Sequence, residues 1–141
     1  MREMSDAERR EFLTTGTRTG KLATVRADGS PHVVPIWFVL DDDTLVFTVD
    51  ANSIKAKALR RDPRVSVCVD DEVPPYAFVL VEGTATILDE AEDKLHWTTR
   101  IGGRYMGTDR AEEFGRRNAV PSELLVRLPP TRMVARAGIA D

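Results

Sequence analysis

The sequence predicts a mainly β protein in which antiparallel strands form a barrel-like sheet with few helices. Short apolar segments recur at the spacing of β-hairpins, and turn residues such as Asp28 and Gly29 lie between them. Helical segments are inserted singly, whereas a doubly wound parallel fold would need a helix after nearly every strand. The 141 residues contain no repeat, linker or low-complexity run, so we expect one domain that spans residues 1–141.

Turn and cap residues place the helices and strands in the first half of the chain. Ser5 and Glu8 have the spacing of a capping box, which predicts that a short helix begins there. A second helix is predicted at residues 53–61. It begins at Ser53, which suits a helix cap, and it must stop before Pro63. Strands are predicted at residues 20–26, 32–40 and 44–49.

The second half of the chain also combines strands with single helices. Asp89 is expected to cap a helix over residues 90–101, which Gly102 and Gly103 should end because glycine is a poor helix former. Thr108 is a suitable cap for a further helix that reaches Arg117. Strands are predicted at residues 64–69, 76–88 (interrupted at Gly83), 122–128 and 131–137.

Composition and charge exclude several classes of protein. The net charge is -3 at pH 7, whereas general nucleic-acid binding needs a broad basic face. No apolar run is long enough to span a bilayer, and residues 1–15 lack a signal-peptide core, so we expect a cytoplasmic protein without a membrane partner. The single cysteine, Cys68, excludes an internal disulfide and suits a reducing compartment. Its alternation with Val67 and Val69 predicts a buried structural thiol.

The sequence contains none of the standard catalytic patterns. His32 and His96 are far apart and have no second ligand at metal-binding spacing, so we expect no metal site. No serine lies in a nucleophile elbow, and Cys68 has no evident basic partner. Gly102 and Gly103 lack the strand and helix that flank a dinucleotide fingerprint. We therefore assign no catalytic residue.

A basic segment between two predicted strands is the strongest functional signal in this acidic protein. Its cations are Lys55, Lys57, Arg60, Arg61 and Arg64. If Ser53 caps the helix, Lys55 falls in the first turn, where the positive end of the helix dipole disfavours a cation. This placement indicates an anion, because free amides, the dipole and an ammonium together form a phosphate site. The alternative is a solvated basic helix that packs on its apolar residues.

A redox cofactor would supply the chemistry that the side chains lack. Such a ligand needs an anion clamp, an apolar slot for a flat ring and backbone groups along the ring edge. Pro35 interrupts a predicted strand, which indicates a sheet edge or a bulge where backbone groups are free to bond a ring. Trp37, Tyr76 and Phe78 are candidates for the walls of the slot, and packing in the core or in a dimer interface explains each of them equally well.

Six short motifs carry a resemblance to a known family. They read GKLAT at residues 20–24, DGSPH at 28–32, VFT at 46–48, SIK at 53–55, LRRDPRV at 59–65 and VEGTA at 81–85. In this order and spacing they resemble the pyridoxamine 5'-phosphate oxidase-like flavin and deazaflavin reductases. The resemblance implies a split β-barrel, which is an FMN-binding-like antiparallel barrel. It also implies a homodimer with two cofactor sites at the subunit interface.

The family pattern assigns roles to particular residues. It implies that Ser53 and Lys55 hold the cofactor phosphate, that Lys57 assists them, and that Thr48 lines the same pocket. Tyr76 and Phe78 match positions that approach the ring from the neighbouring subunit. The pattern leaves open whether Arg60, Arg61 and Arg64 contact the ligand or stabilise the corner between helix and strand. The residues implied to run beside the ring are Val33, Val34, Pro35, Ile36 and Trp37.

One departure from the family pattern bears on the cofactor. FMN-dependent oxidases of vitamin B6 carry an arginine and a lysine along the strand that here reads HVVPIWF, with neither cation. The LRRDPRV motif is similar instead to enzymes that use the deazaflavin coenzyme F420. The resemblance therefore implies an oxidoreductase that transfers hydride from reduced coenzyme F420 to an unsaturated or electron-poor small molecule. The alternatives are an FMN-binding reductase or oxidase, a non-catalytic carrier of the cofactor or of a tetrapyrrole, and a barrel without cofactor.

Overall fold

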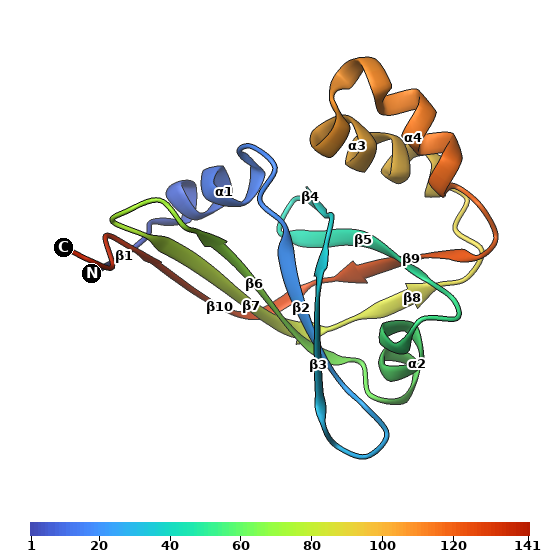
Figure 1. The fold of residues 1–141 in the computed structure, drawn as a ribbon, viewed down its shortest axis with the longest axis horizontal. Coiled ribbons are helices and arrows are strands. Elements are labelled where there is room, and N and C mark those ends of the chain that lie inside the picture. Colours follow the sequence, from blue (N-terminus) through green and yellow to red (C-terminus); the bar gives the residue numbers. More distant parts are fainter.

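The computed structural model describes residues 1–141 and contains two β-sheets in which every strand pair is antiparallel (Figure 1). The larger sheet has the strand order β1-β10-β7-β6-β2-β3. Its strands are β1 (Arg2–Glu3), β2 (Gly20–Val25), β3 (Pro31–Ile36), β6 (Arg64–Asp71), β7 (Ala77–Thr84) and β10 (Pro130–Ala137). The smaller sheet has the order β4-β5-β9-β8. Its strands are β4 (Val39–Asp41), β5 (Thr44–Asp50), β8 (Thr86–Leu88) and β9 (Glu123–Leu128). The predicted mainly β fold is confirmed.

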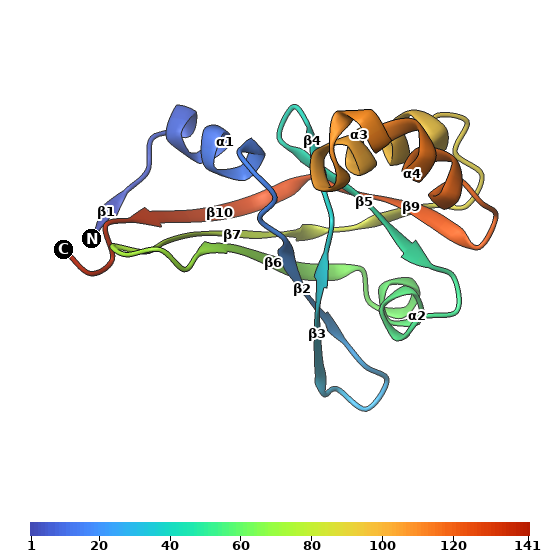
Figure 2. The same ribbon diagram turned by 45° about the horizontal axis from the view of Figure 1, so that its top comes forward.

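The helices lie outside the two sheets. They are α1 (Asp6–Thr14), α2 (Ile54–Arg61), α3 (Lys94–Met106) and α4 (Ala111–Asn118), with a short 3-10 turn, η1 (Thr108–Arg110), before α4. Figure 2 shows α1, α3 and α4 along one side of the molecule, whereas α2 lies apart from them beyond the end of β5. None of the helices combines the length and the apolar character that a bilayer-spanning helix requires.

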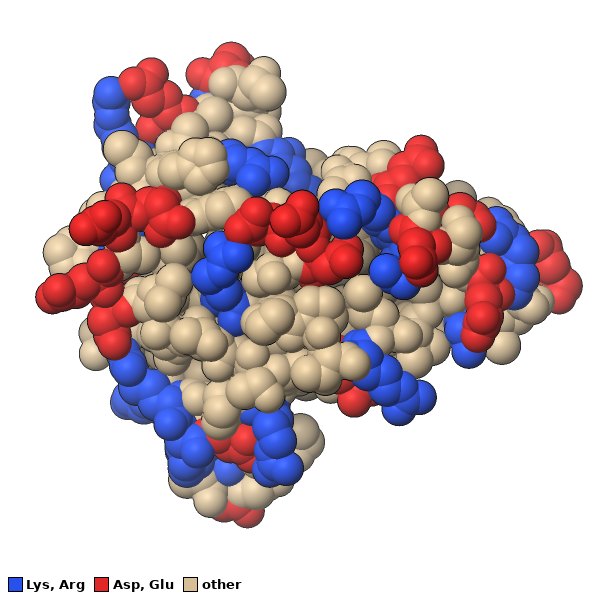
Figure 3. Space-filling view, turned by 180° about the vertical axis from the view of Figure 1, so that it is seen from behind, with Lys and Arg blue, Asp and Glu red and all other residues tan.

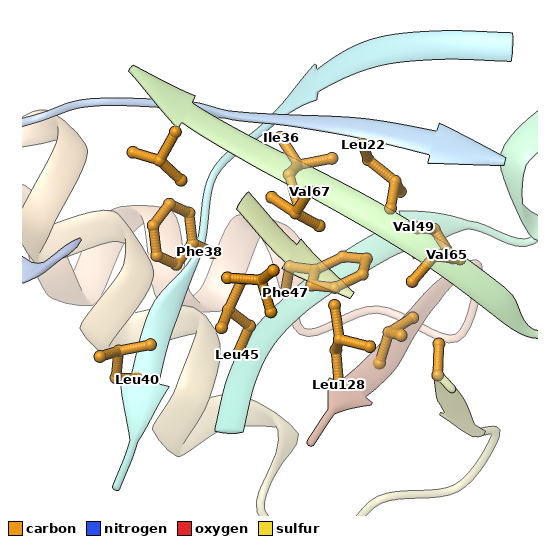
Figure 4. Packing of buried hydrophobic residues seen from close by; sticks show 14 of the residues in the cluster. Leu22, Ile36, Phe38, Leu40, Leu45, Phe47, Val49, Val65, Val67 and Leu128 are labelled. Atoms are coloured by element: carbon orange, nitrogen blue, oxygen red, sulfur yellow. The ribbon is translucent and has the colours of Figure 1, made fainter. Parts of the chain in front are cut away.

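The main hydrophobic core fills the space between the two sheets. Leu22 and Ile36 reach it from the larger sheet, and Phe47 and Leu128 from the smaller one (Figure 4). The side chains alternate along β5, because successive residues of a strand point to opposite faces. Val46 therefore faces away from the main core and packs in a second cluster with side chains of α3. In this way α3 covers the outer face of the smaller sheet.

The predicted strand over residues 32–40 is wrong, because the chain leaves one sheet and enters the other within it. β3 ends at Ile36 and β4 begins at Val39. Between them, the amide of Phe38 donates to the hydroxyl of Tyr105 at 3.2 Å, and its carbonyl oxygen accepts from Arg104 at 2.8 Å. Side chains of α3 thus satisfy the backbone groups that a continuous strand would have placed in a ladder.

The predicted strand over residues 76–88 also divides between the sheets, but at Ala85 and not at Gly83. The amide of Ala85 donates to the carbonyl oxygen of Pro63 at 2.8 Å, outside either ladder. Gly83 lies within β7, where a Cβ atom would stand 2.5 Å from the carbonyl oxygen of Pro129. The glycine therefore permits the close approach of another backbone segment and does not interrupt the strand.

The helix predicted over residues 90–101 lies further along the chain. α3 begins at Lys94 and continues through Gly102 and Gly103 to Met106, so the paired glycines do not end it. A Cβ atom on Gly102 would lie 2.7 Å from the Cβ atom of Phe114 in α4. In return, a Cβ atom on Gly115 of α4 would lie 2.9 Å from the Cα atom of Thr99 in α3. The glycines allow α3 and α4 to pack closely, and this packing outweighs their low helix propensity.

Cys68 is half-exposed, so the predicted buried thiol is wrong. Along β6, Val67 and Val69 point into the main core, and Cys68 lies on the opposite face of the sheet. There it pairs with Lys21 of β2. Burial of part of the side chain raises the pKa of the thiol, so it is less reactive than an ordinary cysteine.

Candidate functional site

The start of α2 has the form that an anion site requires. Ser53 is extended, and its hydroxyl accepts a hydrogen bond from the amide of Ala56 at 3.1 Å, so the predicted cap is confirmed. The first helical bond runs from the amide of Lys57 to the carbonyl oxygen of Ser53 at 3.2 Å. The amides of Ile54 and Lys55 precede this bond and are left without a helical acceptor. They lie at the positive end of the helix dipole, where anions bind.

The arginines that follow in the sequence are engaged in protein contacts. Arg60 pairs with Asp89, and a nitrogen of Arg61 donates to the carbonyl oxygen of Val25 at 2.6 Å. Arg64 donates twice to the carboxylate of Asp62, at 3.0 and 2.8 Å. These hydrogen bonds lower the pKa of Asp62 to about 2. Arg64 thus stabilises the corner between α2 and β6, whereas Arg60 and Arg61 tie α2 to Asp89 and to β2.

Lys55 and Lys57 differ from Arg60 and Arg64 because neither lies within ion-pair distance of a carboxylate. Lys55 is half-buried and Lys57 is exposed. Lys57 also lines a hollow of about 200 Å³ between α2 and the turn that joins β2 to β3. The lining includes Arg26 and Arg61 and contains no acidic side chain. Figure 3 shows basic side chains gathered over this region, at the lower left of the view.

Arg26 is a residue that sequence analysis missed. It lies far from the basic segment in the sequence, and only the return of the β2–β3 hairpin over α2 brings it to Lys57. Its guanidinium donates to the carbonyl oxygen of Pro31 at 3.2 Å, which holds the side chain beside the turn. The pattern of charges along the chain contains no signal for this proximity.

β3 forms an open edge of the larger sheet, which confirms the interpretation of Pro35. The strand pairs with β2 on one side and with no strand on the other. The side chain of Val33 is 59% exposed, whereas that of Ile36 is buried in the core. Ile36 can therefore offer a ligand only its backbone. Val34 is half-buried, and the backbone groups on the open side of β3 have no partner in the sheet.

Trp37 follows directly after β3, and Thr48 lies in β5 of the smaller sheet. The ring of Trp37 stacks on that of Tyr105, with centroids 5.1 Å apart and planes 3° from parallel. Tyr105 is held in place because its hydroxyl donates to the carbonyl oxygen of Arg18 at 2.8 Å. One face of Trp37 is thus covered, and the side chain is 36% exposed. Thr48 lies on β5, half-buried, on the face that points away from the main core.

The structure does not bring Tyr76 and Phe78 near α2 within one chain. Arg64, which follows α2, pairs with Thr84, and the far end of the same hairpin carries Tyr76 and Phe78 (Figure 1). The strands separate these two ends by seven residues, or roughly 23 Å at about 3.3 Å per residue. Tyr76 is 44% exposed and adopts a left-handed backbone with φ 66°. Within one chain, Tyr76 and Phe78 therefore lie at the end of the hairpin opposite α2.

Comparison with known proteins identifies the family. A family model for pyridoxamine 5'-phosphate oxidase matches residues 5–134. The chain belongs to this family. The suspected resemblance is thereby confirmed, and the two antiparallel sheets are the split barrel of pyridoxamine 5'-phosphate oxidases.

Three solved structures resemble this family member along most of its length. A conserved hypothetical protein from Mycobacterium tuberculosis is 32% identical, with a TM-score of 0.84 and coverage of 96% of this chain and 86% of that one. An F420 reductase is 26% identical, with a TM-score of 0.69 and coverage of 87% and 94%. A FAD-binding protein from Mesorhizobium loti is 27% identical, with a TM-score of 0.70 and coverage of 95% and 93%.

Proposed function

We propose that this protein is an oxidoreductase that binds reduced coenzyme F420 and passes hydride from it to an unsaturated or electron-poor organic molecule. The observation that carries the proposal is the pair of lysines on α2. Neither has a carboxylate partner. Lys55 stands in the first turn with the free amides, and Lys57 lines the hollow without acidic residues. The hydride chemistry belongs to the deazaflavin, and the chain supplies binding, orientation and exclusion of water.

The residues at the start of α2 fit a phosphate group. The Lys55 ammonium would hold its oxygens, together with the free amides of the first turn. The hydroxyl of Ser53 now donates to the carbonyl oxygen of Asp50 at 2.7 Å and would turn from it to the phosphate. Lys57 would lie over the adjoining hollow with Arg26 and Arg61, where the oligoglutamate tail of coenzyme F420 would meet positive charge. No acidic side chain lines the hollow, so a carboxylate tail would meet no electrostatic repulsion there.

The ring of the cofactor would lie along the open edge of β3. Backbone groups of Val33, Val34, Pro35 and Ile36 would bond its polar edge, and the exposed side chain of Val33 would contact its face. Trp37 would contact the ring beyond the C-terminal end of β3, with the face that Tyr105 does not cover. Thr48 would line the pocket from β5.

We also propose that the functional unit is a homodimer. Tyr76 and Phe78 lie at the end of the β6–β7 hairpin opposite α2, and β6 and β2 separate β7 from the open edge of β3, so a second copy would bring them to the ring. The exposed ring of Tyr76 suits this role, since a left-handed backbone at a tyrosine is unfavourable and often marks a functional position.

FMN is the second candidate cofactor, favoured by the similarity to a FAD-binding protein. Against it, β3 carries no lysine or arginine, and the F420 reductase is about equally similar. Parallel titrations with coenzyme F420 and FMN, followed by ligand fluorescence, decide between them. We expect coenzyme F420 to bind more tightly. Tight binding of FMN alone would replace the proposal with the FMN-dependent alternative.

Turnover separates an enzyme from a carrier. The reduced cofactor is mixed with the protein and a panel of electron-poor alkenes and nitro compounds, and reoxidation is followed by absorbance. We expect reoxidation that depends on both protein and substrate. Tight binding without turnover across the panel would favour a carrier that stores the cofactor.

A further inference from the structure

A second cavity lies on the other side of the molecule from α2. It has a volume of about 450 Å³ and is enclosed by the C-terminal end of α1, by β4, and by α3 with the turn that follows it. It shares no lining residue with the hollow beside Lys57. Figures 1 and 2 show these elements together at the upper side of the molecule, away from α2. The volume is within the range typical of small-molecule sites.

Arg104 lines this cavity with one group left unsatisfied. Its Nε donates to the carbonyl oxygen of Gly16 at 3.0 Å, and its Nη1 to that of Phe38 at 2.8 Å. Its Nη2 is buried and has no partner. Burial lowers the pKa of the guanidinium, and no carboxylate lies near enough to offset this cost. Buried donors are nearly always paired in folded proteins, so an acceptor is expected at this position.

Arg100 stands one helical turn before Arg104 on the same face of α3. It makes a long contact of 3.4 Å to the carbonyl oxygen of Leu40, and its guanidinium lies over the ring of Trp97 at 5.0 Å. It forms no ion pair, and its remaining N–H groups have no acceptor in the protein. No acidic side chain lines the cavity, so two guanidinium groups face it without a counter-charge.

The rest of the lining combines hydroxyl and apolar groups. Thr14, Thr99 and Thr108 are the other polar residues of the lining, and Val39, Leu40 and Ala111 form its apolar part. A ligand that satisfies this surface carries an anionic head for the guanidinium groups and a small apolar body. A head with two acceptor oxygens suits this surface, because both arginines line the cavity and a carboxylate accepts from two donors.

We propose that this cavity binds the carboxylate of a small, largely apolar organic acid. Arg104 and Arg100 hold the two oxygens, and the apolar wall at β4 contacts the body. The proposal does not rest on the function proposed for α2, because the two sites share no residue.

Calorimetric titration of the full chain with cinnamate, benzoate and hexanoate tests the proposal. We expect at least one of these acids to bind, and its neutral alcohol not to bind. Arg100→Gln and Arg104→Gln should each weaken binding by about tenfold or more, because each removes a charged hydrogen bond. Circular dichroism checks folding, and Arg100→Gln keeps the test valid if loss of the Arg104 contacts disturbs the fold.

Matched controls separate a specific site from general attraction. Arg117→Gln removes the same charge from α4, outside the cavity lining, and should leave the affinity unchanged. Lys55→Ala should also leave it unchanged, whatever that variant does to cofactor binding. Absence of binding by all three acids, equal binding of the alcohol, or equal losses in Arg117→Gln would overturn the proposal. Tighter binding of phenyl phosphate than of any carboxylate would overturn the choice of ligand.

Discussion

Replacement of Lys55 by alanine is the most direct test of the proposed phosphate clamp. Lys55 has no carboxylate partner, so the substitution breaks no ion pair within the protein. A hydrogen bond to a charged group contributes about 1.5–3 kcal/mol. Its loss corresponds to about tenfold to hundredfold weaker binding. Because the side chain is half-buried and water screens part of the interaction, we expect a value near the lower limit.

The stability of the same variant provides an independent reading. Removal of a cation from the first turn of a helix relieves an unfavourable interaction with the dipole, which is about 0.3–1 kcal/mol at an exposed site. Alanine is also the better helix former. Lys55→Ala should therefore unfold at the same temperature as the parent or slightly higher, while it binds the cofactor more weakly. A loss of binding cannot then be attributed to misfolding.

Fluorescence titration of coenzyme F420 at low and moderate salt measures the effect. The parent should lose affinity as salt increases, and Lys55→Ala should lose less, because one charge contact is already absent. Arg117→Ala is the charge control, since that guanidinium lies over the ring of Phe114 in α4 and does not line the hollow beside Lys57. The clamp assignment would be refuted by a Lys55→Ala variant that binds as tightly as the parent.

Three further predictions concern the packing of the helices, the corner after α2 and the exposed tyrosine. Gly115→Ala should lower the free energy of unfolding by about 1–3 kcal/mol in urea, because the new methyl group would collide with Thr99. Stability should fall slightly as the pH is lowered from about 4 to 2, since the pKa of Asp62 is about 2 in the folded chain and 3.8 without its partners, so the unfolded chain takes up the proton first. Tyr76→Gly should weaken cofactor binding and leave stability unchanged or higher, because glycine accepts a positive φ without strain.

Each of these three predictions has its own control. Gly103→Ala meets only the Cβ atom of Ala111, at 3.2 Å, so it should cost less than Gly115→Ala. Asp62→Asn should reduce the acid-dependent loss, because Asp71 and Asp89 also have lowered pKa values, and an unchanged pH profile would show that Asp62 does not contribute. For Tyr76→Gly, unaltered cofactor affinity would argue against a contribution from this residue to either subunit's site.

Local features of the sequence determined the beginnings and ends of several elements. The capping box at Ser5 and the cap at Ser53 depend only on contacts within one helical turn, and both are present in the structure. The stop before Pro63 is equally local, since it follows from the geometry of the proline ring. The charges of α2 were also visible in the sequence, and Lys55 occupies the first turn as expected.

Other predictions failed where distant segments decide the structure. Gly102 was predicted to end a helix, but it lies inside α3, where α4 packs against it. Cys68 was predicted to be buried, but it lies on the face of the sheet that points away from the core. The crossing between sheets at Phe38 depends on hydrogen bonds from Tyr105 and Arg104, residues more than sixty positions away. Nothing in the neighbouring sequence specifies such contacts.

The sequence by itself thus determined the family, the class of fold and the basic helix, because motifs, strand spacing and helix caps act over short stretches of chain. Only the tertiary structure decided which cations remain unpaired, that Arg26 lines the same hollow as Lys57, and that Tyr76 lies at the end of the β6–β7 hairpin opposite α2. These facts depend on which surfaces meet when the strands pair, and pairing between strands is set by packing across the whole core.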